Sequence, residues 1–135
     1  QAVYLFNDSI KNNIVLGEIA DEERLEKAIQ LAQLSTFIKK TINGVETIVG
    51  ERGTMLSGGQ IQRIGIARAI YHESDILIFD ESTNALDLKS ENNIIEEIKE
   101  LKNSKTIIVI SHKLSTLNIC DKVYELKDRN LIKKI

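Results

Sequence analysis

The hydrophobic residues of the first half of the chain recur at the spacing of amphipathic helices. One apolar stripe follows Asp21, a good helix N-cap, and consists of Leu25, Ala28, Ile29 and Ala32. A second runs through residues 61–72 and consists of Ile61, Ile64, Ala67 and Ile70. The spacing therefore predicts two helices, each with one face to bury.

Shorter elements flank these helices. The polar stretch Asn7-Asp8-Ser9 offers N-caps for a short helix through Val15 that Gly17 closes, and residues 35–39 suit another short helix. Residues 41–54 contain three glycines and predict a loop.

Beyond residue 72 the pattern changes to short, continuous apolar runs. Residues 76–79 and 106–110 have the length of strands and lack polar alternation, which predicts strands buried on both faces. Between them, Asp87 caps a predicted helix over residues 88–102, so the two strands should be parallel neighbours joined by a right-handed crossover. The tail, residues 122–126 and 131–135, predicts two short strands about a turn at 128–130, where Asn130 tolerates a left-handed conformation.

Polar side chains follow both predicted parallel strands. Asp80 and Glu81 end the first strand, and Ser111 and His112 end the second. Because ligands of such sheets bind beyond the carboxyl ends of the strands, these groups should share one functional edge. Taken singly, the acids could cap a helix and His112 could be a structural histidine. Together they favour nucleotide chemistry.

The stretch Leu56-Ser57-Gly58-Gly59-Gln60 opens the helix over residues 61–72. Ser57 is a good N-cap, and two glycines leave the first-turn amides accessible. Free amides at the positive end of a helix dipole suit a phosphate. On its own, the Ser-Gly-Gly stretch is more typical of a glycine turn before a core helix.

Composition narrows the class of protein. Hydrophobic residues make up 42% of the 135 residues and charged residues 28%, as in a soluble globular domain. The net charge of −2 gives no reason to expect nucleic acid as a partner, and no apolar run approaches the roughly 18–20 residues that span a bilayer. The single cysteine, Cys120, fits a reducing compartment. The chain starts at Gln1 without an initiator Met, and we expect it to be a piece of a longer protein.

These residues resemble the nucleotide-binding domain of ATP-binding-cassette proteins over the whole chain. Residues 56–60 match the family signature, and residues 76–81 match the Walker B strand. Ala85-Leu86-Asp87 matches the D-loop, Ser111-His112 the switch-histidine loop, and Gln1 the glutamine loop. Residues 5–14 and Val49-Gly50-Glu51-Arg52-Gly53 resemble stretches of the exporter-type cassettes.

The resemblance implies an α/β fold: part of a P-loop NTPase core with parallel strands flanked by helices, an N-terminal helical subdomain and a short C-terminal strand pair. Residues 1–72 would hold the glutamine loop, helical subdomain and signature helix, and residues 73–135 the Walker B, D-loop and histidine-loop part. The implied activity is ATP hydrolysis at a head-to-tail dimer interface, which drives export across a membrane. The domain would lie on the cytoplasmic face of that membrane.

The family's residue roles carry over position by position. Asp80 would hold Mg²⁺ together with Gln1, Glu81 would be the general base, and His112 would contact the γ-phosphate. Asp87 would link the two active sites of the dimer. Leu56, Ser57, Gly58, Gly59 and Gln60 would close on ATP held by the second nucleotide-binding domain. The transmembrane domains would contact Glu51-Arg52-Gly53 and the helical subdomain.

One departure matters. The phosphate loop G-x-x-x-x-G-K-[ST] is missing, since no glycine of the 135 residues is followed by lysine. We therefore expect the isolated chain to bind ATP weakly and to be inactive, and its sheet to expose an apolar face. Two alternatives remain open: a soluble cassette ATPase without a transport role, and a non-catalytic interaction fragment. The transported substrate is not encoded in these residues.

Overall fold

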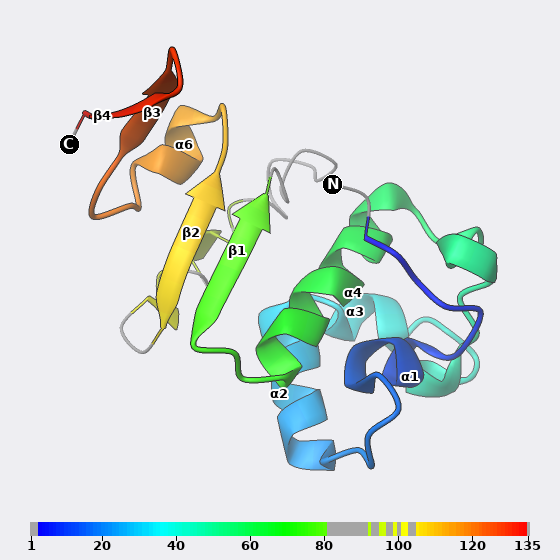
Figure 1. The fold of residues 1–135 in the computed structure, drawn as a ribbon. Helices are drawn as coiled ribbons and strands as arrows, with labels where there is room; N and C mark the ends of the chain where they lie inside the picture. The colour runs from blue at the N-terminus through cyan, green and yellow to red at the C-terminus, as the bar shows by residue number, and fades with distance from the viewer. Residues whose placement is uncertain are drawn as a thin grey trace.

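The computed structural model describes residues 3–80, 92, 95, 96, 99, 101, 102 and 105–134. In the described part of the chain, three α-helices and two 3-10 turns precede α4, and all the strands follow α4, with α6 between β2 and β3 (Figure 1). In order, the elements are α1 (Ile10–Val15), α2 (Glu22–Leu31), α3 (Ser35–Ile38), the 3-10 turns η1 (Gly44–Glu46) and η2 (Glu51–Gly53), α4 (Gly58–Tyr71), β1 (Ile76–Asp80), β2 (Thr106–Ile110), α6 (Leu114–Leu117), β3 (Tyr124–Lys127) and β4 (Asn130–Lys133). The helix predicted over residues 88–102, with its cap Asp87, lies largely outside the described residues.

Side-chain caps fix where the first two helices begin. Ser9 caps α1 by accepting a hydrogen bond from the amide of Asn12, and Asp21 caps α2 in the same way from Arg24. Both caps were predicted. The predicted end of α1 at Val15 is confirmed, and both Leu16 (φ 54°) and Gly17 (φ 83°) are left-handed, with the Leu16 amide bonding the Asn12 carbonyl.

The segment predicted as a loop, residues 41–54, is more ordered than its glycines suggested. It contains η1 and η2, and Ile48 forms an isolated antiparallel bridge with Ser9. Val49 is fully buried, and its amide bonds the Asp8 carbonyl. This segment is therefore fastened to the N-terminal residues, just ahead of α4.

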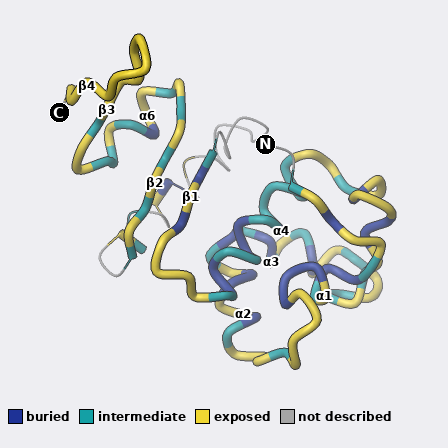
Figure 2. Tube along the Cα trace, in the orientation of Figure 1, coloured by how far each residue is buried: buried dark blue, intermediate teal, exposed yellow. Residues whose placement is uncertain are grey.

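The core lies where α1 and α2 pack against α4 (Figure 2). Its fully buried residues are aliphatic apart from Tyr71 and Asn13, and include Leu5, Ile10, Ile14, Ala28, Leu34 and Ile64. The predicted inner face of α4 is confirmed at Ile64, Ala67 and Ile70. Burial of this aliphatic surface is the main force that holds the helical half together.

The two strands β1 and β2 pair in parallel, with Ile76 opposite Thr106 and Asp80 opposite Ile110. Leu77 and Phe79 point into the cluster shared with α4. The prediction that both faces are buried is wrong, because the other face keeps four isoleucines about half exposed: Ile76 at 56%, Ile78 at 65%, Ile108 at 47% and Ile110 at 51%. An apolar run allows burial on both faces, but only a covering element produces it.

The connection between α4 and β1 is short and firmly held. Lys105, just before β2, donates to the carbonyls of Glu73 and Ser74 at 2.9 and 3.0 Å. The Thr106 amide bonds the Asp75 carbonyl at 2.9 Å, which continues the parallel ladder. These bonds set the register of β1 against β2.

The tail forms the predicted antiparallel hairpin, with shifted bounds. Leu126 faces Leu131, and the turn residues are Asp128 and Arg129, with φ of 50° and 64°. Asn130, which would tolerate a left-handed conformation, is instead the first residue of β4. Two consecutive left-handed residues are what a two-residue hairpin turn needs to match strand twist.

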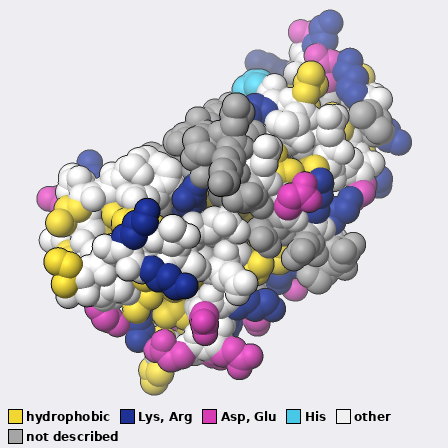
Figure 3. All heavy atoms as spheres, turned by 180° about the vertical axis from the view of Figure 1, so that it is seen from behind, with side chains coloured by type: hydrophobic (Ala, Val, Ile, Leu, Met, Phe, Trp, Pro, Cys, Tyr) yellow, Lys and Arg dark blue, Asp and Glu magenta, His cyan; other side chains and the backbone are white. Residues whose placement is uncertain are grey.

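On the face seen in Figure 3, Lys and Arg side chains are interspersed with Asp and Glu.

Candidate nucleotide site

Two polar residues stand together at the carboxyl edge of the parallel strands. Asp80 is the last residue of β1 and is partly exposed, while His112 follows β2 by two residues and is exposed. Ser111, which lies between the end of β2 and His112 in the sequence, accepts a hydrogen bond from the amide of Lys113 at 3.0 Å. The structure thus confirms that Asp80 and His112 share one edge, and leaves both accessible to a ligand.

The signature turn begins α4 with a reciprocal capping box. Ser57 Oγ accepts from the Gln60 amide at 3.3 Å, and Gln60 Oε1 accepts from the Ser57 amide at 2.8 Å. Among the described residues, none accepts a hydrogen bond from the amides of Gly58 or Gly59. Two amides at the positive end of a 14-residue helix are therefore available to an anion.

The signature turn and the strand ends lie at the same end of the molecule. In Figure 1, α4 descends toward the connection at residues 72–75 and β1 ascends from it. The amino end of α4 and the carboxyl end of β1 are thus both at the top of the view. Both candidate phosphate-binding features therefore face the same end of the described structure.

Not every predicted site residue can be placed. Leu56, Ser57, Gly58, Gly59, Gln60, Asp80 and His112 lie within the described part of the chain. Gln1, Glu81 and Asp87 lie outside the described residues. No set of three His, Cys, Asp or Glu side chains that could hold a metal occurs among the described residues. The Asp80 carboxylate supplies one hard oxygen ligand. Such a ligand fits Mg²⁺, which proteins commonly bind through one or two carboxylates together with water and phosphate.

Two polar core residues escaped the sequence analysis. Asn13 is fully buried, accepts from the Phe6 amide at 2.8 Å, and donates to the carbonyls of Phe6 and Ser9 at 3.0 Å each. Arg68, on α4, donates to the carbonyls of Asn13 at 2.8 Å and Tyr4 at 3.1 Å. Burial lowers the pKa of the Arg68 guanidinium. Neither residue belongs to a short motif that would have marked it.

An open groove of about 760 Å³ lies beside these residues. Its lining combines aromatic and polar side chains: Tyr4, Phe6, Asp8, Asn12, Leu16, Gly17, Glu18 and Arg68. Tyr4 and Phe6 are 56% and 53% exposed and meet edge to face at 5.3 Å between ring centroids. Tyr and Phe are enriched at protein–protein interfaces. The exposed Tyr4–Phe6 pair therefore favours a contact surface here.

The segment Glu51-Arg52-Gly53 carries backbone strain. Arg52 is exposed and left-handed, with φ 54° and ψ 23°. Gly53 has φ 77°, and a Cβ there would lie 3.0 to 3.1 Å from Ile61 and Leu5 side chains. A left-handed non-glycine residue of this kind costs about 1–2 kcal/mol, so the tertiary structure holds Arg52 in this conformation.

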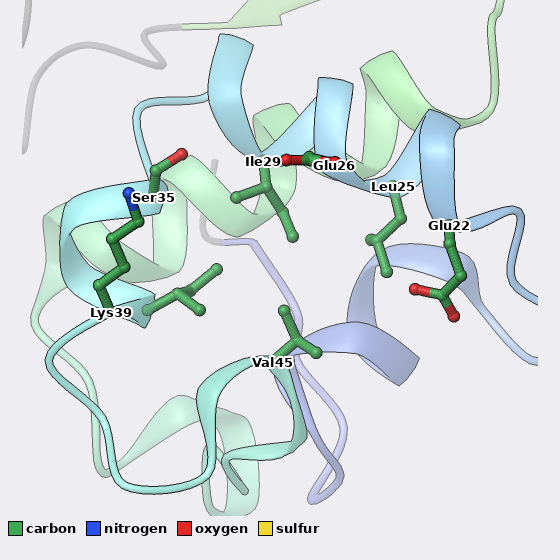
Figure 4. A pocket seen from close by; sticks show the side chains of 8 residues that line it. Glu22, Leu25, Glu26, Ile29, Ser35, Lys39 and Val45 are labelled. Atoms are coloured by element: carbon green, nitrogen blue, oxygen red, sulfur yellow. The ribbon is translucent and has the colours of Figure 1, made fainter.

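A smaller hollow of about 330 Å³ lies between α2, α3 and η1 (Figure 4). Its lining residues are Glu22, Leu25, Glu26, Ile29, Ser35, Ile38, Lys39 and Val45. Lys11 bonds Glu22 on the rim at 2.8 Å, and this contact raises the pKa of Lys11. None of the lining residues belongs to the signature turn or to the strand ends, so we assign the hollow no part in nucleotide chemistry.

Comparison with known proteins decides the family. The model of the ABC transporter family matches residues 1–84, which is more than half of the chain. The chain belongs to the ABC transporter family. The resemblance drawn from the motifs is therefore confirmed, and so is the α/β fold class.

Relatives in the ABC transporter family share both sequence and fold with this chain. An ATP-dependent lipid A-core flippase of Vibrio vulnificus (strain CMCP6) is 44% identical over 136 residues, and the flippase of Escherichia coli (strain K12) is 43% identical. The solved structure of a bacterial Atm1-family ABC exporter with ATP bound superposes with a TM-score of 0.90 at 39% identity and covers 97% of this chain.

The chain spans 23% of the length of these ABC relatives, for both the flippases and the exporter structure. Within the described residues, no helix has the length and apolar character needed to cross a bilayer.

Proposed function

We propose that this chain is part of the ATP-hydrolysing, energy-coupling domain of an ABC exporter. The observation that carries the proposal is the parallel pairing that sets Asp80 and His112 on one edge, in a member of the ABC transporter family. The capped signature turn and the 0.90 TM-score to an ATP-bound exporter support it further. In this proposal residues 73–135 carry Asp80, Glu81 and His112, and residues 1–72 carry Gln1, the signature turn and the surfaces that the transmembrane domains contact.

The proposed chemistry needs an oriented water and neutralised phosphate charge. Asp80 and Gln1 would hold Mg²⁺, which would supply positive charge to neutralise the phosphates. Glu81 accepts a proton from the attacking water, and His112 donates a hydrogen bond to the γ-phosphate. Asp87 links the two sites of the dimer. The accessibility of Asp80 and His112 is compatible with these roles.

The signature turn acts on the nucleotide of a second nucleotide-binding domain in this proposal. The Gly58 and Gly59 amides and the Ser57 hydroxyl suit a γ-phosphate, but the turn offers no lysine to capture free ATP. Leu56 and Gln60 hold the turn, since Leu56 packs on the core and Gln60 completes the capping box. A turn of this kind is suited to closing over ATP that another loop already holds.

The transmembrane domains contact two surfaces of this chain in our proposal. One is Glu51-Arg52-Gly53, where the strained, exposed Arg52 supports a contact role. The other is the groove beside the Tyr4–Phe6 aromatic pair on the helical part. The domain then lies on the cytoplasmic face of the membrane. The flippase relatives are named for lipid A-core, but in our proposal the membrane domains, and not these residues, choose the substrate.

The test of this function replaces Glu81 with glutamine in the full-length exporter. Glu81→Gln keeps the shape of the side chain but removes its basicity, so ATP hydrolysis falls by orders of magnitude while ATP-dependent dimerisation persists. Phosphate release and size-exclusion chromatography measure the two properties.

Glu26→Gln is the matched control, since Glu26 is an exposed glutamate on α2. It should hydrolyse ATP at the wild-type rate. Hydrolysis by Glu81→Gln at the wild-type rate would remove Glu81 from the role of general base.

A further inference from the structure

The residues that follow Gln1 are fastened to the signature helix at two points. Arg68, near the end of α4, reaches back to the carbonyls of Tyr4 and Asn13 at 3.1 and 2.8 Å. One turn of α4 earlier, Gly65 leaves room for Val3, because a Cβ on Gly65 would lie 2.6 Å from Val3 Cγ2. The segment thus lies directly against α4 at Val3 and at Tyr4.

Asn13 extends this attachment to the aromatic groove. Its side chain bonds both the amide and the carbonyl of Phe6, so the backbone on either side of the ring is held. Its own carbonyl is the acceptor of the shortest Arg68 hydrogen bond. A continuous set of hydrogen bonds therefore leads from α4 through Arg68 and Asn13 to the backbone of Tyr4 and Phe6.

The hydrogen bonds of Arg68 and Asn13 join separate backbone segments to one another. Asn13 is fully buried, and Arg68 is half-buried with its planar guanidinium shared between two carbonyls nine residues apart in the sequence. A hydrogen bond from a charged donor is stronger than one between neutral groups, so the two bonds from Arg68 resist separation of the two elements. Few other side chains could bridge both acceptors, because the guanidinium fork presents several donors in fixed directions.

We propose that Arg68 is a positioning residue that makes the Tyr4–Phe6 groove and the signature helix move as one body. The proposal rests on the proposed function, in which a membrane domain contacts the groove and the signature turn closes on ATP. A displacement of the groove then reaches the amides of Gly58 and Gly59 along α4, without a direct contact between the two sites.

Hydrogen exchange in the full-length exporter tests this coupling. Amide exchange is followed in peptides covering residues 4–9 and 57–63, without nucleotide and after trapping with Mg-ATP and vanadate. In the wild type, trapping changes exchange in both peptides. In Arg68→Gln, residues 57–63 still respond, whereas the response of residues 4–9 is lost. Arg68→Lys keeps a cation that can reach one carbonyl, and restores part of the response.

Arg63→Gln is the control on the same helix, since Arg63 donates to the Gln33 carbonyl, at 3.5 Å, and not to the residues that follow Gln1 within the described part of the chain. It should keep the wild-type response. A merely structural role of Arg68 would raise exchange of residues 4–9 equally in both states and leave the difference intact, which would overturn the proposal. If Arg68→Gln fails to fold, Arg68→Lys carries the test, and a response of residues 4–9 equal to that of the wild type would overturn the proposal. A wild-type exporter without ATPase activity would instead overturn the proposed function.

Discussion

Ser57 combines a structural role with a proposed chemical one, and a single substitution separates them. The structural role is the N-cap, in which Ser57 Oγ accepts from the Gln60 amide at 3.3 Å. The chemical role is contact with a γ-phosphate. Aspartate ranks with serine as an N-cap, so Ser57→Asp preserves the first role. It also places a negative charge where the phosphate should come, and so removes the second.

The stability effect of Ser57→Asp follows from helix electrostatics. A carboxylate at the amino end of α4 interacts favourably with the helix dipole by about 0.3–1 kcal/mol. The free energy of unfolding of the 135-residue chain should therefore stay equal or rise slightly. Ser57→Ala is the matched comparison. It loses the cap hydrogen bond, and because that bond is long and Ser57 is exposed, the loss should be near 0.5–1 kcal/mol, at the lower end of cap substitutions.

The functional effect has the opposite sign and a larger size. Two unit charges 4 Å apart repel by about 1 kcal/mol in water and about 4 kcal/mol at an effective dielectric constant of 20. Since about 1.4 kcal/mol is tenfold in rate, ATP hydrolysis by the full-length Ser57→Asp exporter should fall roughly five- to a thousandfold. Closure of the signature turn over the phosphate excludes water and so lowers the effective dielectric constant, which moves the fall in ATP hydrolysis toward the thousandfold value.

Two measurements check both halves of this reasoning. Urea unfolding followed by circular dichroism gives the stability of the chain, and phosphate release gives the ATPase rate of the exporter. A Ser57→Asp exporter that hydrolyses ATP as fast as the wild type would refute the phosphate role of the turn. A Ser57→Asp chain less stable than Ser57→Ala would refute the cap argument.

Two further predictions concern the isolated chain. Isothermal titration of the 135 residues with Mg-ATP should detect no binding in the micromolar range, because no glycine is followed by the lysine that captures phosphates, and a micromolar Kd would contradict this. Arg52→Gly should relieve a left-handed cost of about 1–2 kcal/mol, partly offset by about 0.5–1 kcal/mol of glycine entropy, and so raise the urea midpoint relative to Arg52→Ala. Equal midpoints for the two variants would show that Arg52 is unstrained.

Local signals in the sequence were sufficient for the helix starts. Ser9, Asp21 and Ser57 cap the helices that they were expected to cap, because an N-cap depends only on residues one to three positions away. The end of α1 at Val15 was also predicted, and Gly17 is left-handed as a helix-ending glycine should be, but Leu16 is left-handed as well, and nothing local to the sequence marks it.

Features that depend on distant neighbours were predicted least well. The apolar run of β1 was correctly placed as a strand parallel to β2, yet Ile76 and Ile78 remain exposed, because burial depends on what covers the sheet. Arg68 and Asn13 act on backbone carbonyls 55 and 7 residues away, so neither motif nor periodicity marks them. In the candidate site, Asp80 and His112 were placed together correctly because parallel pairing alone fixes their shared edge.

The two hydrogen bonds from Lys105 to the carbonyls of Glu73 and Ser74 limit the insertions and deletions that this chain can accept. Side chains alternate between the two faces of a strand, so inserting or deleting one residue in the connection at 72–75 would turn Asp80 from one face of the sheet to the other. Length changes there should be far less tolerated than substitutions. By contrast, the exposed tip around Ile42, at 99% exposure, should accept added residues with little effect.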